Sequence, residues 1–244
     1  MIEIKDLSHS FGGNQVLKNI SLFVGEGEIM AVMGSSGGGK TTLLRCISGL
    51  ITPTSGSVLV DGINVKEQPE DARKKMGMVF QSAALFDYLT VGQNVLFGVR
   101  RHHRLSAKEE ESLLKDTLSR VNLEGNEDLF PAELSGGMKK RVGMARAIAL
   151  NPKVLLYDEP TTGLDPITTY QIDELVASLR KTLGATSMLV SHDLISVQRT
   201  ADRVAFLDKG EIVFSGSPAE FLKDKHPSIV EVVEKSQART LANK

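Results

Sequence analysis

The sequence predicts an α/β fold with a mostly parallel sheet at its core, an antiparallel β subdomain and an inserted α-helical subdomain. Three observations support this prediction. A buried apolar strand at residues 31–33 leads directly into a glycine-rich loop and then a helix. Strands and helical patterns alternate again after residue 150, which is typical of a parallel sheet. Between these two parts, residues 82–150 have a helical pattern, which indicates an insertion in the core.

The first part of the chain is rich in short strands that are separated by turns. We expect strands over residues 2–6, 20–24, 28–33 and 57–60. The turns between them are predicted from Gly12-Gly13, Gly25-Glu26-Gly27 and Asp61-Gly62. A helix over 42–48 follows the glycine loop, and a further buried strand is expected at 76–80.

Two helices are predicted in the inserted region. Ser106 and Glu109 have the spacing of a capping box, in which each side chain binds the backbone N–H of the other at a helix start. Apolar residues then follow at helical intervals. The second helix is expected over 138–150, with its apolar residues on one face.

Strand–helix alternation resumes in the last third. Strands are expected at 154–157 and 187–190, with a helix between them that ends near Leu183, and a hairpin is expected from strands 204–207 and 211–214. Ser217 and Pro218 begin another helix, and 229–244 reads as a helix that frays. We therefore expect one domain over 1–244. Its predicted parts are the core with its β subdomain (1–81 and 151–225), the helical subdomain (82–150) and a C-terminal tail (226–244).

Composition narrows the class of protein. Hydrophobic residues make up 41% of the 244 residues, enough for a substantial core. The formal net charge of -1 gives no long-range attraction for nucleic acid, so no nucleic-acid partner is expected. The lone Cys46 excludes an internal disulfide and is expected to be a buried thiol in a cytoplasmic protein. We see no signal peptide and no apolar run near the roughly 18–20 residues that span a bilayer, so membrane work would require a partner.

The glycine loop fits the G-x-x-x-x-G-K-[ST] pattern that binds nucleotide phosphates. Its backbone N–H groups form a nest for phosphate oxygens, and the following helix adds the partial positive charge of its N-terminus. Lys40 would reach the β- and γ-phosphates, and the Thr41 hydroxyl would ligate Mg²⁺. The expected ATP-binding residues of this segment are Gly34, Ser35, Ser36, Gly37, Gly38, Gly39, Lys40, Thr41 and Thr42.

Asp158 and Glu159 close the apolar strand at 154–157. A carboxylate near the phosphates can hold Mg²⁺ through a water, which suits Asp158. The next can orient or deprotonate the attacking water, which suits Glu159. An ordinary acidic strand end is the simpler alternative, but the adjacent acids with Pro160 do not fit it well.

The segment Leu134-Ser135-Gly136-Gly137-Met138 lies between the phosphate loop and the two acids. With these motifs, the chain resembles the ATP-binding cassette (ABC) ATPases over nearly its whole length. In that family the Leu-Ser-Gly-Gly signature binds the γ-phosphate of ATP held by the opposite subunit. The resemblance therefore implies a head-to-tail homodimer in which Ser135, Gly136 and Gly137 complete the partner's site. Met138 stands where the family usually has glutamine.

The resemblance assigns roles to further residues. His192, in Ser191-His192-Asp193, matches the switch histidine near the γ-phosphate, and Gln81 matches the glutamine that contacts Mg²⁺. Asp165 lies in the Gly-Leu-Asp turn that couples the two sites of the dimer. Phe11 takes the place of the adenine-stacking aromatic, with Val16 packed nearby against the base or ribose. The other histidines are expected at the surface.

One branch of the family is closest in pattern. The strings "ALFD-LTV", Leu-Ser-Gly-Gly-Met-Lys-Lys-Arg and Asp-Pro-Ile-Thr resemble MlaF-like ATPases, which drive phospholipid transport between bacterial membranes. This implies a MlaE-type permease that docks near Leu85 to Val95, with a Mce-type substrate-binding protein and a small accessory subunit. The chain would then lie peripherally on the inner face of the membrane.

Other functions stay open. Amino-acid importers and lipoprotein-releasing ATPases share every catalytic motif, and an iron–sulfur assembly ATPase would have a similar single cassette without a permease. ABC proteins of ribosomes, DNA repair or chromosomes carry duplicated cassettes, zinc motifs or long coiled coils. This chain has one cassette, one cysteine and no sustained heptads, which argues against that class.

Overall fold

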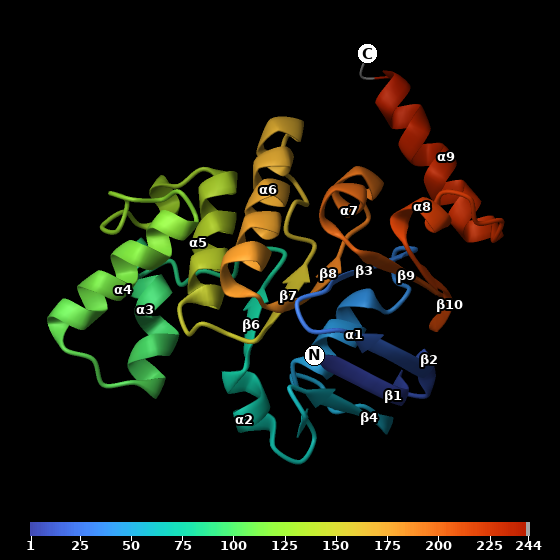
Figure 1. The fold of residues 1–244 in the computed structure, drawn as a ribbon, viewed down its shortest axis with the longest axis horizontal. Helices are drawn as coiled ribbons and strands as arrows, with labels where there is room; N and C mark the ends of the chain where they lie inside the picture. Colours follow the sequence, from blue (N-terminus) through green and yellow to red (C-terminus); the bar gives the residue numbers. More distant parts are fainter. Residues whose placement is uncertain (243–244) are drawn as a thin grey trace.

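The computed structural model describes residues 1–242, with side chains described to residue 238, and it contains two sheets with helices around them (Figure 1). The larger sheet has six strands in the order β10-β9-β3-β8-β7-β6. All neighbours in it are parallel except the β9–β10 pair, which is the predicted hairpin. Its strands are β3 (Ile29–Gly34), β6 (Met76–Val79), β7 (Val154–Asp158), β8 (Thr186–Val190), β9 (Arg203–Asp208) and β10 (Glu211–Gly216). The mostly parallel core is confirmed.

The smaller sheet is antiparallel, in the order β2-β1-β4-β5, and confirms the predicted β subdomain. Its strands are β1 (Ile2–Phe11), β2 (Asn14–Val24), β4 (Ser55–Val60) and β5 (Ile63–Asn64). The strands predicted at 2–6 and 20–24 are too short. Register shifts interrupt the β1–β2 ladder, and Asp6 and Asn19 adopt positive φ angles of 48° and 50°. These bulges break the alternation of apolar and polar residues that a sequence pattern detects.

The inserted region is helical, as predicted, and forms one end of the molecule (Figure 1, green). Its elements are α3 (Val91–His102), α4 (Ala107–Arg120), the 3₁₀ turn η1 (Pro131–Glu133) and α5 (Gly136–Ile148). The capping box is confirmed, because Ser106 N donates to Glu109 Oε2 at 2.7 Å and Glu109 N to Ser106 Oγ at 3.4 Å. The helix predicted at 138–150 begins and ends two residues earlier.

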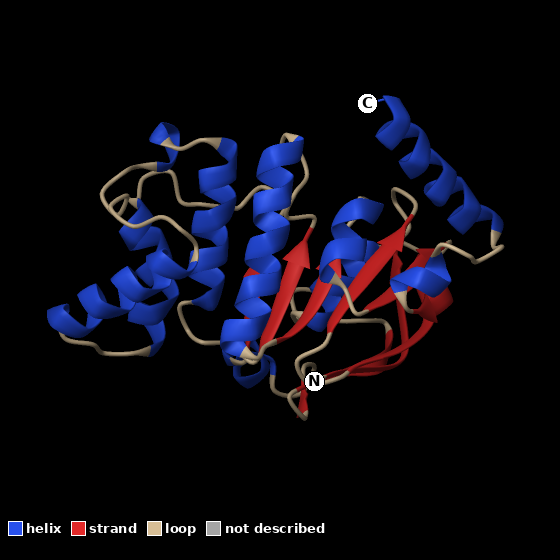
Figure 2. Cartoon of the chain, turned by 45° about the horizontal axis from the view of Figure 1, so that its top comes forward, coloured by secondary structure: helices blue, strands red, loops and turns tan. Residues whose placement is uncertain are grey.

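The remaining helices lie around the two sheets, and the C-terminal helix extends away from them (Figure 2). They are α1 (Lys40–Ile47), α2 (Pro69–Lys74), α6 (Pro166–Leu183), α7 (Leu194–Thr200), α8 (Pro218–Phe221) and α9 (Pro227–Ala242). Buried residues of α1, among them Leu43 and Cys46, pack in one cluster with residues of both sheets, so α1 lies between the sheets. None of the helices in the described part of the chain is long and apolar enough to cross a bilayer.

The C-terminal tail packs on the core through the first half of α9. Ile229 is buried, and Val232 and Val233 pack beside it against the cluster that contains Phe206 and Phe221. Residues 243–244 of the predicted fraying helix lie outside the described residues.

The prediction that four histidines lie at the surface is correct for His102 and His103 only. His9 is 7% exposed and meets the Phe11 ring edge-on, with the ring centroids 4.4 Å apart. His226 is half-buried, with its Nδ1 enclosed. His9 is buried because its side chain lies on the same face of β1 as the core residue Leu7.

The helical insertion meets the parallel sheet where α5 crosses β6. A Cβ atom placed on Gly77 would lie 2.2 Å from the carbonyl oxygen of Ala147 and 2.9 Å from the Leu155 side chain. The backbones of α5 and β6 therefore approach each other more closely than any side chain would permit. Gly98, in α3, offers a contrast, because its Cβ would lie 3.6 Å from Leu150, an ordinary contact distance.

We expect Gly77→Ala to lower the free energy of unfolding by about 1–3 kcal/mol, since the added methyl group must push α5 away from the sheet. Gly98→Ala is the matched control, and should be neutral or raise stability by up to about 1 kcal/mol through its higher helix propensity. Urea denaturation followed by circular dichroism measures both. Equal stability of the two variants would show that the α5–β6 contact is not tight.

Candidate active site

The phosphate loop connects β3 to α1, in the predicted strand–loop–helix order. Two of its glycines are required by geometry. Gly34 has a φ of 151°, and a Cβ there would lie 2.1 Å from the Leu207 carbonyl oxygen. Gly39 has a φ of 102°, and its Cβ would lie 2.9 Å from the Leu17 side chain. The loop is therefore fixed between β9 on one side and β2 on the other.

Lys40 is the first residue of α1, and its ammonium group lies within the loop. Its Nζ donates to the carbonyl oxygens of Gly34 at 3.0 Å and Ser35 at 2.9 Å. The residue is only 7% exposed, and this burial lowers the pKa of Lys40, although the carboxylates of Glu159 and Asp158 oppose the change. The loop thus holds a cation at the place where phosphate oxygens are expected.

Thr41 and Asp158 provide oxygen ligands suited to Mg²⁺. The Thr41 hydroxyl donates to Asp158 Oδ1 at 3.1 Å, and burial raises the pKa of Asp158. No group of three or more His, Cys, Asp or Glu side chains that could enclose a metal occurs among residues 1–238. A hydroxyl and one carboxylate fit Mg²⁺ nevertheless, because this ion keeps several waters and phosphate oxygens in its octahedron.

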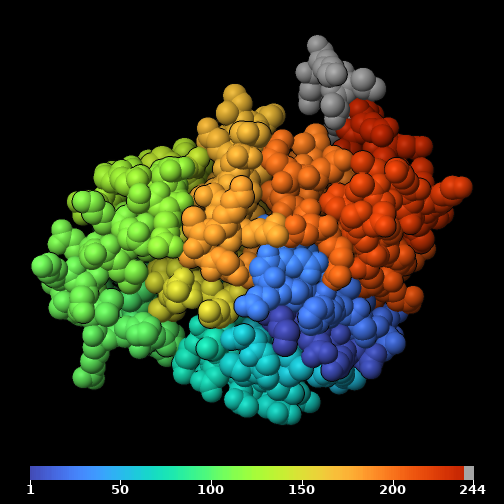
Figure 3. Space-filling view, viewed as in Figure 1, coloured from blue at the N-terminus to red at the C-terminus, as the bar shows by residue number. Residues whose placement is uncertain are grey.

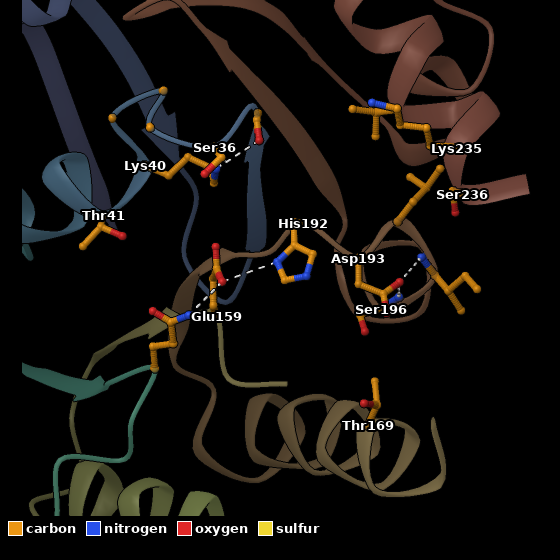
Figure 4. A pocket seen from close by; sticks show the side chains of 18 of the residues that line it. Ser36, Lys40, Thr41, Glu159, Thr169, His192, Asp193, Ser196, Lys235 and Ser236 are labelled. Carbon is orange, nitrogen blue, oxygen red and sulfur yellow. Dashed lines mark hydrogen bonds and ion pairs between the residues drawn. The ribbon is translucent and has the colours of Figure 1, made fainter. Parts of the chain in front are cut away.

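Glu159 is the centre of the site (Figure 4). Its Oε2 accepts hydrogen bonds from Thr162 Oγ1 at 2.9 Å and Gln81 Nε2 at 3.2 Å, and lies 3.4 Å from His192 Nδ1. Its φ of 47° is in the left-handed region, which is strained for a residue other than glycine. Strain of this kind persists only where neighbours fix the residue, as these three side chains do for Glu159.

One pocket of about 1260 Å³ contains most of the predicted residues. Its wall includes Val16, Gly34, Ser36, Gly37, Gly38, Gly39, Lys40, Thr41, Thr42, Gln81, Glu159 and His192. Figure 3 shows the face on which the colours of the phosphate-loop region (blue) and of the residues that follow β7 and β8 (orange) adjoin. Ser35 and Asp158 are not part of the wall. Phe11 is also outside it, 49% exposed at the end of β1.

The signature residues do not line this pocket. Ser135 caps α5, with its Oγ accepting from Met138 N at 3.2 Å, and both Ser135 and Gly136 are exposed. The first residue of α5 therefore lies at the surface and outside the pocket that contains Lys40, whereas Gly137 is buried and the Met138 N–H is bound by Ser135. Asp165 caps α6 by accepting from the N–H groups of Ile167 and Thr168, both at 3.0 Å. The hydrogen bond from the Thr168 hydroxyl is the main cause of a lowered pKa of Asp165.

Sequence reasoning missed part of the pocket wall. α7 contributes Ser196 and Arg199, and α9 contributes Val232, Lys235 and Ser236. The start of α7 had a detectable signal, since Asp193 is a typical N-cap residue and its Oδ1 accepts from Ile195 N at 2.8 Å. The approach of α9 to the pocket had no such signal, because it depends on packing between distant parts of the chain.

Comparisons with known proteins agree with this geometry. A family model described as "ABC transporter" matches residues 17–162, which contain the phosphate loop, the signature and both acids. The glutamine transport ATP-binding protein GlnQ of Escherichia coli (strain K12) is 41% identical over 227 residues, covering 92% of this chain and 94% of GlnQ. The intermembrane phospholipid transport system ATP-binding protein MlaF of the same strain is 41% identical over 233 residues, covering 94% of this chain and 87% of MlaF. The dimeric post-hydrolysis structure of the ATP-binding cassette MJ0796, bound to ADP and Pi, is similar with a TM-score of 0.81 at 33% identity, covering 89% and 99% of the two chains.

We expect Asp158→Asn to make the nucleotide-free protein more stable than the wild type at neutral pH. Burial raises the pKa of Asp158 above its ordinary value of 3.8, so the folded state binds this proton more tightly than the unfolded state. The stability that the carboxyl group contributes is therefore present below pH 3.8 and is lost as pH rises through the folded pKa. Asparagine stays neutral, so the difference in unfolding free energy in favour of the variant should grow from about pH 4 to pH 7.

Thermal unfolding at stepped pH measures this difference, with the exposed Asp116→Asn as a control that should show no such trend. Asp158→Asn should also lose the additional stabilisation that Mg²⁺ gives to the ATP-bound protein. A wild-type advantage that increases with pH would contradict the unfavourable burial of this carboxylate.

Proposed function

The chain belongs to the ABC transporter family, and on this basis we propose that it is the ATP-hydrolysing subunit of a phospholipid transporter. Family membership establishes the coarser part of this statement: the chain is an ABC ATP-binding subunit that hydrolyses ATP with Mg²⁺. The roles of individual residues, the dimer, the permease and the phospholipid cargo are our proposals. Each rests on a separate feature of the structure.

The chain's own side chains divide the chemistry among them. Loop N–H groups and Lys40 bind the β- and γ-phosphates, and Thr41 and Asp158 hold Mg²⁺. When bound, this ion neutralises charge on the phosphate oxygens. Glu159 accepts the proton of the attacking water, because its carboxylate lines the pocket and its Oε2 is held by Thr162 and Gln81, whereas the other carboxylate of the wall, that of Asp193, caps α7. His192 and Gln81 keep that oxygen in place.

A second copy of the chain completes the site. The exposed N-terminus of α5 at Ser135 and Gly136 is an anion-binding helix start that lines no part of its own chain's pocket. A head-to-tail homodimer would place it over the phosphates held by the other copy. The dimeric MJ0796 cassette, bound to ADP and Pi, supports the formation of a dimer. Asp165, exposed at the start of α6, would then lie between the two sites.

Glu159→Gln should reduce ATP hydrolysis by roughly 10²–10⁴-fold, the usual loss when a general base is removed, while ATP binding is retained. The neutral amide keeps the shape of the side chain, so the variant should accumulate as an ATP-bound dimer in sedimentation experiments. Glu174→Gln, an exposed position on α6, serves as the control and should hydrolyse ATP normally. A monomeric Glu159→Gln protein with near-normal turnover would remove Glu159 from the proposed role.

GlnQ and MlaF are equally similar overall, so the phospholipid assignment rests on the three MlaF-like strings, at residues 84–91, 134–141 and 165–168. The aromatic side chains of the first string and of the neighbouring α3 do not fill the core. Tyr88 and Phe97 are 73% and 46% exposed, and Phe86 lies between them with ring centroids 6.0 and 4.5 Å away. We call Phe86, Tyr88 and Phe97 the aromatic patch.

The buried side chain of Asn94 holds this loop rigid. Its amide nitrogen donates to three loop carbonyl oxygens, those of Phe86, Leu89 and Thr90, at 3.0–3.1 Å. A preformed aromatic surface suits an amphipathic helix of a partner. We propose that a cytoplasmic helix of a MlaE-type permease docks here, with a Mce-type protein and a small accessory subunit in the same complex. The chain would then be peripheral on the inner face of the membrane.

An affinity pull-down from detergent-solubilised membranes tests this proposal. The native chain should recover a multi-helix permease, a Mce-type protein and bound phospholipid. Combining Tyr88→Ala with Phe97→Ala should release the permease without changing the ATPase activity of the isolated chain. Phe130→Ala, at an exposed aromatic residue outside the patch, is the matched control and should retain it.

The other outcomes separate the alternatives. A permease with a different periplasmic partner would reassign the cargo, for example to an amino acid or a lipoprotein. Recovery of soluble partners alone would overturn the transport proposal and favour an assembly ATPase of the iron–sulfur type.

A further inference from the structure

Two helices begin at functional loops of the site. α6 follows Asp165, whose carboxylate caps it, and α7 begins at Leu194, two residues after His192. Asp193 joins the histidine to α7, since its Oδ1 accepts from the N–H groups of Ile195 and Ser196. A small rotation of α7 would therefore move His192 relative to Glu159. Whatever fixes α7 against α6 also fixes the histidine against the Asp165 turn.

One ion pair, with a buried carboxylate and a guanidinium that is partly exposed, joins these helices. Arg199 of α7 donates from Nη1 to Asp173 Oδ2 of α6 at 2.6 Å. Asp173 is 2% exposed, and the Arg199 guanidinium lies 4.6 Å from the centre of the Tyr170 ring, also on α6. Arg199 forms part of the wall of the same pocket as Glu159 and His192. Its side chain thus contacts α6 at two points beside the site.

Stability does not explain this pair. Burial raises the pKa of Asp173, although Ser196 and Arg199 act in the opposite direction. Removing the Asp173 carboxylate from water costs free energy, and its attraction to the Arg199 guanidinium, whose side chain is 29% exposed, is weakened by solvent. An ion pair does, however, fix geometry more narrowly than an apolar contact, because both hydrogen-bond direction and distance are restricted.

We propose that Arg199 is a positioning residue for ATP hydrolysis: by binding Asp173 it sets the orientation of α7 on α6, and so holds His192 at the oxygen of Glu159. The proposal rests on the roles proposed above for His192 and Asp165. It implies that contacts made at the Asp165 turn reach the histidine through α6, Asp173, Arg199 and α7. His192 lies 3.4 Å from Glu159, so displacement by even one ångström would break their contact.

A second ion pair provides a matched control. Arg180 of α6 binds Asp202, just after α7, with its Nη1 2.8 Å from Asp202 Oδ1. The residue types are the same and the two arginine side chains are similarly exposed, at 36% for Arg180 and 29% for Arg199. The Asp202 side chain, however, is 40% exposed against 3% for Asp173, and neither Arg180 nor Asp202 lines the pocket. If tethering α6 to the α7 region were all that mattered, the two pairs would be equivalent. The proposal requires that only the pair at the site affects hydrolysis.

The test replaces the Arg199–Asp173 pair by an apolar one, Arg199→Met with Asp173→Leu, in the full chain. We expect kcat to fall about 10- to 100-fold, the scale of a misplacement near one ångström, with ATP affinity by calorimetry within about threefold of wild type. The thermal midpoint should be unchanged or higher. Arg199→Lys keeps the charge and should recover part of kcat, and Arg180→Met should keep all of it. A folded apolar variant with wild-type kcat would overturn the proposal.

His192→Ala separates this proposal from the role of the histidine itself. If His192→Ala reduces kcat strongly and Arg199→Met adds nothing to it, the two residues act through one step, as proposed. If the two losses multiply fully, Arg199 acts independently and the proposal fails, while the role of His192 stands. Normal hydrolysis by His192→Ala would rule out both the role of His192 and the proposal for Arg199. These single variants also give an answer if the apolar pair does not fold.

Discussion

The site depends on the parallel alignment of four adjacent strands, β3, β8, β7 and β6. Each strand ends in, or is followed by, a polar group of the site. These are the phosphate loop after β3, His192 after β8, Asp158 and Glu159 at the end of β7, and Gln81 after β6. Parallel strands end at the same edge, so residues from distant parts of the sequence meet there. The antiparallel sheet and α1 pack in one cluster with strands of the parallel sheet, and Val16 of β2 lines the pocket at this edge.

The same edge concentrates features that oppose folding. Lys40 and Asp158 are both nearly buried. Burial lowers the pKa of Lys40 and raises the pKa of Asp158, so it favours the neutral form of each side chain. Glu159 adopts a left-handed conformation that costs of order 1 kcal/mol or more. Bound phosphates would place negative charge beside Lys40, and Mg²⁺ would place positive charge beside Asp158. We infer that nucleotide binding offsets the free-energy cost of burying these two groups.

A feature could be predicted from the sequence when the residues that form it are close together in the chain. The phosphate loop at 34–41 and the acids at 158–159 could be proposed from local patterns, a glycine loop and a strand end, whereas His192 was proposed only from the resemblance to the family. The buried strands of the parallel sheet were predictable from short apolar runs. The bulges in β1, the burial of His9 and the Arg199–Asp173 pair depend on contacts between segments distant in sequence, and no local pattern encodes them. The approach of α9 to the pocket is of the same kind.

The ATP pocket and the signature helix that would complete a site lie at different places on the chain, which suggests how hydrolysis is controlled. One chain gathers the phosphate loop, Glu159 and His192 in a single pocket, yet its own signature helix begins at the surface. In the proposed dimer, closure would bring that partial positive charge to the phosphates and press on the Asp165 turn at the same time. Because α6 and α7 are joined by Arg199, the second event would reach His192. Closure would then stabilise the transition state, and the same contact at the Asp165 turn would act on the base that each chain already holds in place.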